Sequence, residues 1–291
     1  MIERSALKTD ADFGSFDTRE LTEAWRQAHF AAQVAAEVGK SWALEKPDDS
    51  QSSFSWVRTR DWRGLEGMPT PGTTPCHARL RFETLELSVD DARGRTAATL
   101  SLSGLTLDQA MDWVSSACLR VLGPRRQPSR PAPDLPDHPV AHGEPFHVLP
   151  NGLRILADLY DGTARMLAKL VGEVRAFEEP RCWPHHFDLA SLAVFDTDDG
   201  GAVIKSIGVG ITPPDSVESS GYWYVSPWVK DGGSVSPEDR QLSVGLWSDR
   251  GAGGAMAILP ISVLSTSHDP PANLAAFVAE AFNACAEVLG V

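Results

Sequence analysis

The sequence predicts an α+β protein made of two related halves, each with an antiparallel β-meander between helices. Apolar residues recur at helical spacing near both ends of each half, and they alternate at strand spacing in between. Residues 124–150 contain eight prolines, which is typical of an extended linker without packed secondary structure. We therefore expect an N-terminal half at 1–123, the proline-rich linker at 124–150 and an enlarged C-terminal half at 151–291.

The first half is predicted to have one helix at each end, at 18–40 and 106–123. Asp17 and Glu20 have the spacing of a capping box at the start of the first helix, as do Thr106 and Gln109 at the start of the second. The glycine and proline that follow the second helix are a typical helix end. Strands are expected at 53–60, 78–89 and 96–103.

The second half is predicted to repeat this plan with additional strands. The two closing helices both end in the pattern Ala-Cys-x-x-Val-Leu-Gly, at 117–123 and 284–290. The two opening helices share a Val-Gly pair, at 38–39 and 171–172. A match at both ends of the unit favours an internal duplication. Helices are expected at 152–177 and 272–289, and strands at 186–195, 202–212, 222–228, 241–247 and 255–263.

Composition and charge narrow the classes of partner and the cellular compartment. The formal net charge of −13 repels phosphate backbones and anionic lipid, so neither nucleic acid nor a membrane is an expected partner. There is no uninterrupted run of apolar residues long enough for a membrane span, and we expect no secretory signal because residues 1–17 are polar and acidic, without an apolar segment. Four scattered cysteines are typical of a reduced, cytoplasmic protein. The sequence is compatible with a monomer or a homodimer.

The segment 181–188 gathers a thiol, two imidazoles and a carboxylate, and it contains the main candidate catalytic residues. His185, His186 and Asp188 lie here, whereas the corresponding positions of the first half include Ser52 and Ser53. If both segments have the same structural role, the fold does not require the histidines. On a strand, His186 and Asp188 would share one face about 6.6 Å apart, with His185 on the other face.

Two neighbouring predicted strands have the composition of a small-molecule pocket. Gly208 and Gly210 would leave one face of their strand without side chains. Tyr222, Tyr224 and Trp228 would form an aromatic wall on the adjacent strand. The alternative interpretation is an ordinary aromatic core in which the glycines relieve crowding.

Four interpretations of the histidines remain open. They could be structural, with His186 held by Asp188. They could bind a divalent metal, or His186 could act in metal-free acid–base catalysis, tuned by Asp188 with a tyrosine as donor. Finally, Cys182 could be an exposed nucleophile activated by a histidine. In the metal site, His186 and Asp188 would need a third ligand, for which the candidates are His268, His147, Glu218 and Asp215.

Nucleotide cofactors have no support, because the chain has no phosphate-binding loop, and Gly208 and Gly210 continue into no glycine-rich dinucleotide motif. The Val-Gly-Lys at 38–40, the strand meander, the proline-rich linker and the stretch ending in Phe-Asp-Leu-Ala at 187–190 resemble a family of uncharacterised bacterial proteins known only as a domain of unknown function. The resemblance covers most of the chain and implies no activity. Around His185 and His186 the sequence departs from the family's pattern.

These observations lead to one main hypothesis and one rival. The main hypothesis is an enzyme that acts on a small molecule at a His/Asp/aromatic pocket, by metal-assisted or general acid–base chemistry. The rival is a non-catalytic module that binds a small ligand or a partner protein, in which the histidines are structural.

Overall fold

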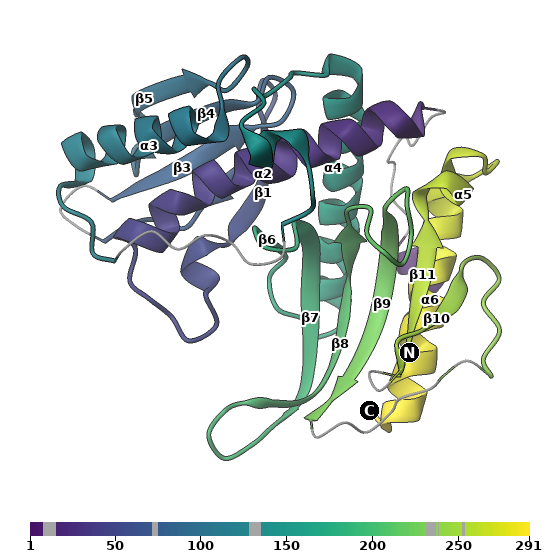
Figure 1. Ribbon diagram of the computed structural model, residues 1–291. Helices are drawn as coiled ribbons and strands as arrows, with labels where there is room; N and C mark the ends of the chain where they lie inside the picture. Colours follow the sequence, from purple (N-terminus) through teal and green to yellow (C-terminus); the bar gives the residue numbers. More distant parts are fainter. Residues whose placement is uncertain (8–15, 72–74, 128–134, 231–236, 238, 252–253) are drawn as a thin grey trace. The chain divides into compact units, whose positions relative to one another are not determined.

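The computed structural model describes residues 1–7, 16–71, 75–127, 135–230, 237, 239–251 and 254–291 (Figure 1). Its helices and antiparallel strands confirm the α+β class. The chain forms two compact units that interleave in sequence. The N-terminal unit comprises 19–157 and 181–188, and the C-terminal unit comprises 1–18, 158–180 and 189–291. Neither unit is a continuous half of the sequence, because each includes a segment from beyond the expected boundary.

The N-terminal unit contains six strands in the order β6-β1-β2-β3-β4-β5, and neighbouring strands pair antiparallel. Its core is formed by apolar side chains of the sheet and of the two long helices. The elements are α2 (Thr18–Trp42), η1 (Ser50–Ser52), β1 (Phe54–Arg58), β2 (Arg63–Gly67), β3 (Cys76–Arg81), β4 (Glu86–Asp91), β5 (Thr96–Ser101), α3 (Leu107–Leu122), η2 (Pro139–His142) and β6 (Arg181–Trp183).

Helix α3 begins as its sequence predicts. The Thr106 hydroxyl accepts a hydrogen bond from the Gln109 amide at 3.3 Å, and the Gln109 side chain accepts one from the Thr106 amide at 2.9 Å. Both predicted members of this capping box are therefore in place. At the start of α2 the Glu20 carboxylate accepts a hydrogen bond from the Gly152 amide at 3.1 Å.

The prediction of a single strand at 78–89 is wrong. It is two strands, β3 and β4, joined by a four-residue turn from Phe82 to Leu85. Leu85 has a φ of 49°, in the left-handed region that non-glycine residues rarely adopt. Both Phe82 and Leu85 are nevertheless fully buried, so buried apolar residues continue into the turn from both strands, with a slip in the alternation between them. Strand β2 was not predicted.

The proline-rich segment is packed over its residues 135–149. It contains η2, and the side chains of Val140 and Phe146 are buried in the N-terminal unit. The backbone of Phe146 accepts from the Gly104 amide at 2.9 Å and donates to the Leu105 carbonyl at 2.8 Å. Residues 128–134 of the expected linker lie outside the described residues.

The C-terminal unit contains a five-stranded antiparallel sheet in the order β7-β8-β9-β11-β10 (Figure 1). The strand expected at 241–247 begins only at Leu246, and the strand expected to reach Val263 ends at Pro260, where a short helix follows. The elements are α1 (Arg4–Leu7), the part of α4 (Pro150–Glu173) from residue 158 onward, β7 (Asp188–Thr197), β8 (Val203–Thr212), β9 (Tyr222–Val229), β10 (Leu246–Asp249), β11 (Ala255–Pro260), α5 (Ile261–Ser265) and α6 (Pro270–Leu289).

Helices pack on one face of this sheet. The Trp223 indole donates to the Thr163 hydroxyl of α4 at 3.0 Å, and α6 contacts β8, β9 and β11. By length and composition α6 could cross a membrane, a criterion that core helices of soluble proteins also meet. In this structure 61% of its most apolar stretch is buried.

The glycines matched by the expected duplication have different surroundings. A Cβ atom on Gly39 would lie 2.1 Å from the Gln51 carbonyl oxygen, so α2 and the backbone before β1 approach each other closely there. A Cβ atom on Gly172, the corresponding residue, would meet nothing within 4 Å. These contacts give no support to an internal duplication, which stays a prediction.

Candidate functional site

The two candidate histidines lie in a turn, so the prediction of a strand from His186 is wrong. Strand β6 ends at Trp183, β7 begins at Asp188, and the four residues between them form a turn. The Phe187 amide donates to the Trp183 carbonyl at 2.6 Å. Because the chain turns between His186 and Asp188, strand alternation no longer places these two side chains on one face.

Phe187 ends this turn with a φ of 54° although it is a fully buried aromatic residue. Such a conformation costs on the order of 1–3 kcal/mol and persists only where the surroundings enforce it. Leu85 has nearly the same φ at the same position of the four-residue turn between β3 and β4. The geometry of the turn therefore accounts for the strained φ of Phe187.

Two side chains of α2 hold the turn in place. The His29 Nε2 lies 2.9 Å from the Pro184 carbonyl oxygen, and the Gln33 amide donates to the same oxygen. The His29 ring also stacks on Phe187, with centroids 5.0 Å apart and planes 6° from parallel. Since a carbonyl oxygen can only accept, His29 carries its proton on Nε2.

Burial lowers the pKa of His29 to about 4. Hydrogen bonds to the backbone of Pro184 and His185 act in the opposite direction, and the nearby His186 and His185 lower the pKa further. His29 is therefore neutral near pH 7, and it acts as a buried brace for the turn that carries the other two histidines.

His185 and His186 contact each other at the surface of the N-terminal unit. Their ring centroids are 4.3 Å apart with planes at 55°; His185 is partly buried and His186 is exposed. Burial lowers the pKa of His185, His186 and Lys40 lower it further, and Asp49 acts in the opposite direction. This pair of rings beside a lysine and an aspartate was not apparent from the sequence spacing.

The hypothesis of an exposed Cys182 nucleophile is wrong. Cys182 lies on β6, opposite Phe54 of β1, and is fully buried. The other three cysteines are also free thiols in buried positions. A nucleophile must be at least partly exposed to reach its substrate, and the Cys182 thiol is not exposed.

The candidate third ligands of a metal site are divided between the two units. His147 belongs to the N-terminal unit together with His186 and Asp188, whereas the other candidates, His268, Glu218 and Asp215, belong to the C-terminal unit. Among the described residues, which include all six, no group of three or more His, Cys, Asp and Glu side chains is placed to hold a metal ion.

The residues of the predicted aromatic wall lie on the C-terminal sheet, on the face opposite Trp223 and the helices. In one cross-strand row Leu246 pairs with Ile258, Ile258 with Tyr224, and Tyr224 with Gly210. The side chains of this row and its neighbours form a surface that we call the aromatic face. It comprises Tyr222, Tyr224, Trp228, Leu246, Met256 and Ile258.

The aromatic face has a buried centre and exposed margins. Tyr222, Met256 and Ile258 are buried and form one cluster, against which Tyr224 packs. Trp228 and Leu246, by contrast, are 48% and 50% exposed. Large apolar side chains therefore remain accessible on the same face as a packed aromatic cluster.

The two glycines beside this face have different roles. A Cβ on Gly210 would lie 2.6 Å from the Ala190 Cβ, so this glycine relieves crowding between β7 and β8. The atoms nearest to a Cβ on Gly208 would be side-chain atoms of Tyr224 and Leu192 and a backbone oxygen, at 3.7 Å or more, which is ordinary van der Waals contact. The strand face without side chains that the sequence predicted is therefore limited to Gly208. Gly210 is explained by its close contact with Ala190.

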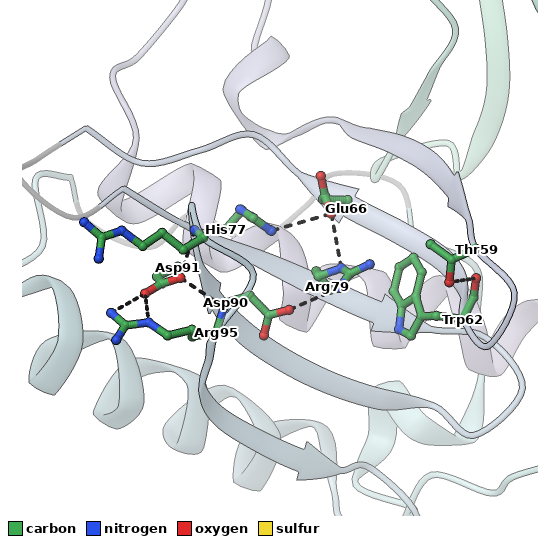
Figure 2. Close-up of polar contacts among 9 residues, drawn as sticks. Thr59, Trp62, Glu66, His77, Arg79, Asp90, Asp91 and Arg95 are labelled. Carbon is green, nitrogen blue, oxygen red and sulfur yellow. Dashed lines mark hydrogen bonds and ion pairs between the residues drawn. The ribbon is translucent and has the colours of Figure 1, made fainter.

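A polar cluster that the sequence did not reveal lies on the N-terminal sheet (Figure 2). Arg79 Nε is 3.1 Å from Glu66 Oε2, and its Nη1 is 3.3 Å from Asp90 Oδ2. The guanidinium also lies 3.9 Å from the Trp62 ring centroid, and His77 Nε2 is 3.5 Å from Glu66. In the sequence, this cluster could have been found from the alternation of His77, Arg79 and Arg81 with apolar residues, which indicates a strand with one polar face.

Almost all of the net negative charge of the chain belongs to one unit. The C-terminal unit has twenty-one acidic and nine basic residues, a net charge of −12. The N-terminal unit has eighteen acidic and seventeen basic residues, a net charge of −1. The aromatic face therefore belongs to a strongly acidic unit.

Comparison with protein-family models, with curated proteins and with solved structures finds no match. The predicted His/Asp/aromatic pocket is not contained in either unit alone, because the histidines and Asp188 belong to one unit and the aromatic residues to the other.

Proposed function

We propose that the protein is a non-catalytic interaction module that binds a partner protein through the aromatic face. The observation that supports this most directly is the exposure of Trp228 and Leu246, at 48% and 50%, beside a packed cluster on the same sheet face. Tryptophan, tyrosine and methionine are enriched in protein–protein interfaces, and tryptophan and tyrosine are frequent energetic hot spots.

The charge of the C-terminal unit favours a partner with a basic surface. A net charge of −12 attracts positively charged proteins over a range of about 10 Å at moderate salt and accelerates their association. The same charge repels nucleic acid. The partner would therefore combine apolar residues for the aromatic face with surrounding lysine or arginine residues.

The histidines fit a structural role better than a catalytic one. His29 is buried, neutral and bonded to the Pro184 carbonyl, and its stacking partner Phe187 is part of the same turn. His185 and His186 occupy the outer side of that turn. These contacts favour the interpretation that the segment is a braced turn rather than the centre of a small-molecule enzyme.

The test is retention of a protein from an extract of the native organism by immobilised wild type, Trp228→Ser, Leu246→Ser and the control Val288→Ser. Val288 is also an exposed apolar residue, on α6, outside the aromatic face. A protein retained by wild type and control should then be purified, and its dissociation constant measured with each variant at low and high salt. If Trp228 is a hot spot, its replacement by serine should weaken binding by about 30-fold or more.

The expected partner binds wild type and Val288→Ser equally, binds Trp228→Ser much more weakly, and dissociates as salt rises. If no retained protein depends on Trp228, or if the purified protein binds all four forms with the same affinity, the aromatic face is not the binding surface.

A further inference from the structure

Strand β5 is an unprotected edge of the N-terminal sheet. It pairs with β4 along one side and ends the strand order, and in the described part of the chain no strand lies along its other side (Figure 1). Four of its six residues are exposed. Its unpaired backbone amides and carbonyls are therefore available to another extended segment.

The composition of β5 does not prevent strand pairing. Proteins usually protect such edges with charged residues, proline or irregular backbone. The sequence Thr-Ala-Ala-Thr-Leu-Ser at 96–101 has no charged residue and no proline. The pairing with β4 is irregular at Ala97, an extra residue of β5 between Thr96 and Ala98. Ala98 to Ser101 are regularly paired, so this part of the edge is regular enough to continue the ladder.

The hairpin that carries β5 is firmly held, so the edge is presented in a fixed conformation. Asp91 accepts hydrogen bonds from the backbone amides of Arg93 and Arg95, at 2.9 and 3.0 Å. It also forms an ion pair with the Arg95 guanidinium at 2.8 Å (Figure 2). A preorganised edge loses little conformational entropy when it pairs with another strand.

We propose that β5 pairs antiparallel with β5 of a second copy of this chain, across a two-fold axis. In the register that places Thr99 opposite Thr99 of the second copy, no like charges meet between the strands, since neither strand has a charged side chain. The pairing would cover Leu100, which lies opposite Leu87 of the core and is partly exposed in one copy.

The charge distribution makes β5 the favoured edge for self-association. The N-terminal unit has a net charge of only −1, so two such units approach each other without strong repulsion. The edge strand β10 ends in Asp249 and belongs to the unit with a net charge of −12. This inference is independent of the proposed function, which concerns the aromatic face.

The test is sedimentation velocity over a wide range of concentration with wild type, Thr99→Lys and the control Thr59→Lys. Thr99 is exposed on β5, and Thr59 is an exposed threonine in the turn between β1 and β2. We expect a reversible dimer for wild type and for Thr59→Lys. Thr99→Lys should dimerise at least about tenfold more weakly, because two lysines approach each other across the axis.

A mixture of Thr99→Lys with Thr99→Glu should form a heterodimer at concentrations where each variant alone is a monomer. This rescue separates a lost contact from a misfolded variant. The proposal is overturned if wild type is a monomer at every concentration. It is also overturned if Thr99→Lys dimerises as tightly as Thr59→Lys, or if the mixture stays monomeric.

Discussion

Replacing His29 with glutamine should remove a large part of the acid sensitivity of this protein. His29 is 4% exposed, bonded to the Pro184 carbonyl and stacked on Phe187. Its pKa falls from an ordinary value of 6.5 to about 4 in the folded state. Between these two pH values the unfolded chain binds a proton at this position and the folded chain does not, so the free energy of unfolding decreases as the pH falls through this window.

The size of the effect follows from the shift in pKa. One pKa unit corresponds to about 1.4 kcal/mol, so the wild type should lose about 3 kcal/mol from this residue between about pH 7 and about pH 4. Glutamine does not titrate and can still donate a hydrogen bond. His29→Gln should therefore be less stable than wild type at neutral pH but should lose about 3 kcal/mol less on acidification.

The assay is urea unfolding followed by tryptophan fluorescence at several pH values, with His186→Gln as the matched control. His186 is exposed in the same turn and only adds to the effect of burial on the pKa of His29, so its replacement should change the pH dependence much less than His29→Gln does. Equal pH dependence for wild type and His29→Gln would show that His29 is not held neutral by burial, and the proposed brace would be wrong.

Two pairs of glycine substitutions test the packing of the two units. Gly210→Ala should lower the free energy of unfolding by about 1–3 kcal/mol through crowding with β7, whereas Gly208→Ala should change it by less than about 1 kcal/mol. Gly39→Ala should destabilise by several kcal/mol because its Cβ would overlap a carbonyl, while Gly172→Ala should stabilise α4 by up to about 1 kcal/mol. Urea unfolding measures all four, and equal effects within either pair would contradict the described contacts.

Local sequence was sufficient where the deciding interactions span only a few residues. The capping box of Thr106 and Gln109 joins groups three positions apart, so its side chains meet whenever the helix forms. The apolar stripes likewise predicted the long helices to within a few residues at most ends.

Sequence patterns failed at the two turns that end in a left-handed, non-glycine residue. Leu85 and Phe187 are fully buried, and their side chains extend the apolar alternation through residues that do not belong to a strand. Turn rules rely on glycine and asparagine at such positions, so they gave no signal here. Only contacts with distant residues, such as the stacking of His29 on Phe187, hold the backbone there.

For the candidate site, the sequence by itself determined which residue types were available and which strand positions share a face. It placed Tyr222, Tyr224 and Trp228 at alternating positions of one strand, and β9 contains all three, because alternation along a strand is a local property. The tertiary structure alone decided that His185 and His186 belong to a different unit, that Cys182 is buried and that β5 ends its sheet. These outcomes depend on which strands pair across long sequence separations, and that choice is made by packing of the whole chain rather than by neighbouring residues.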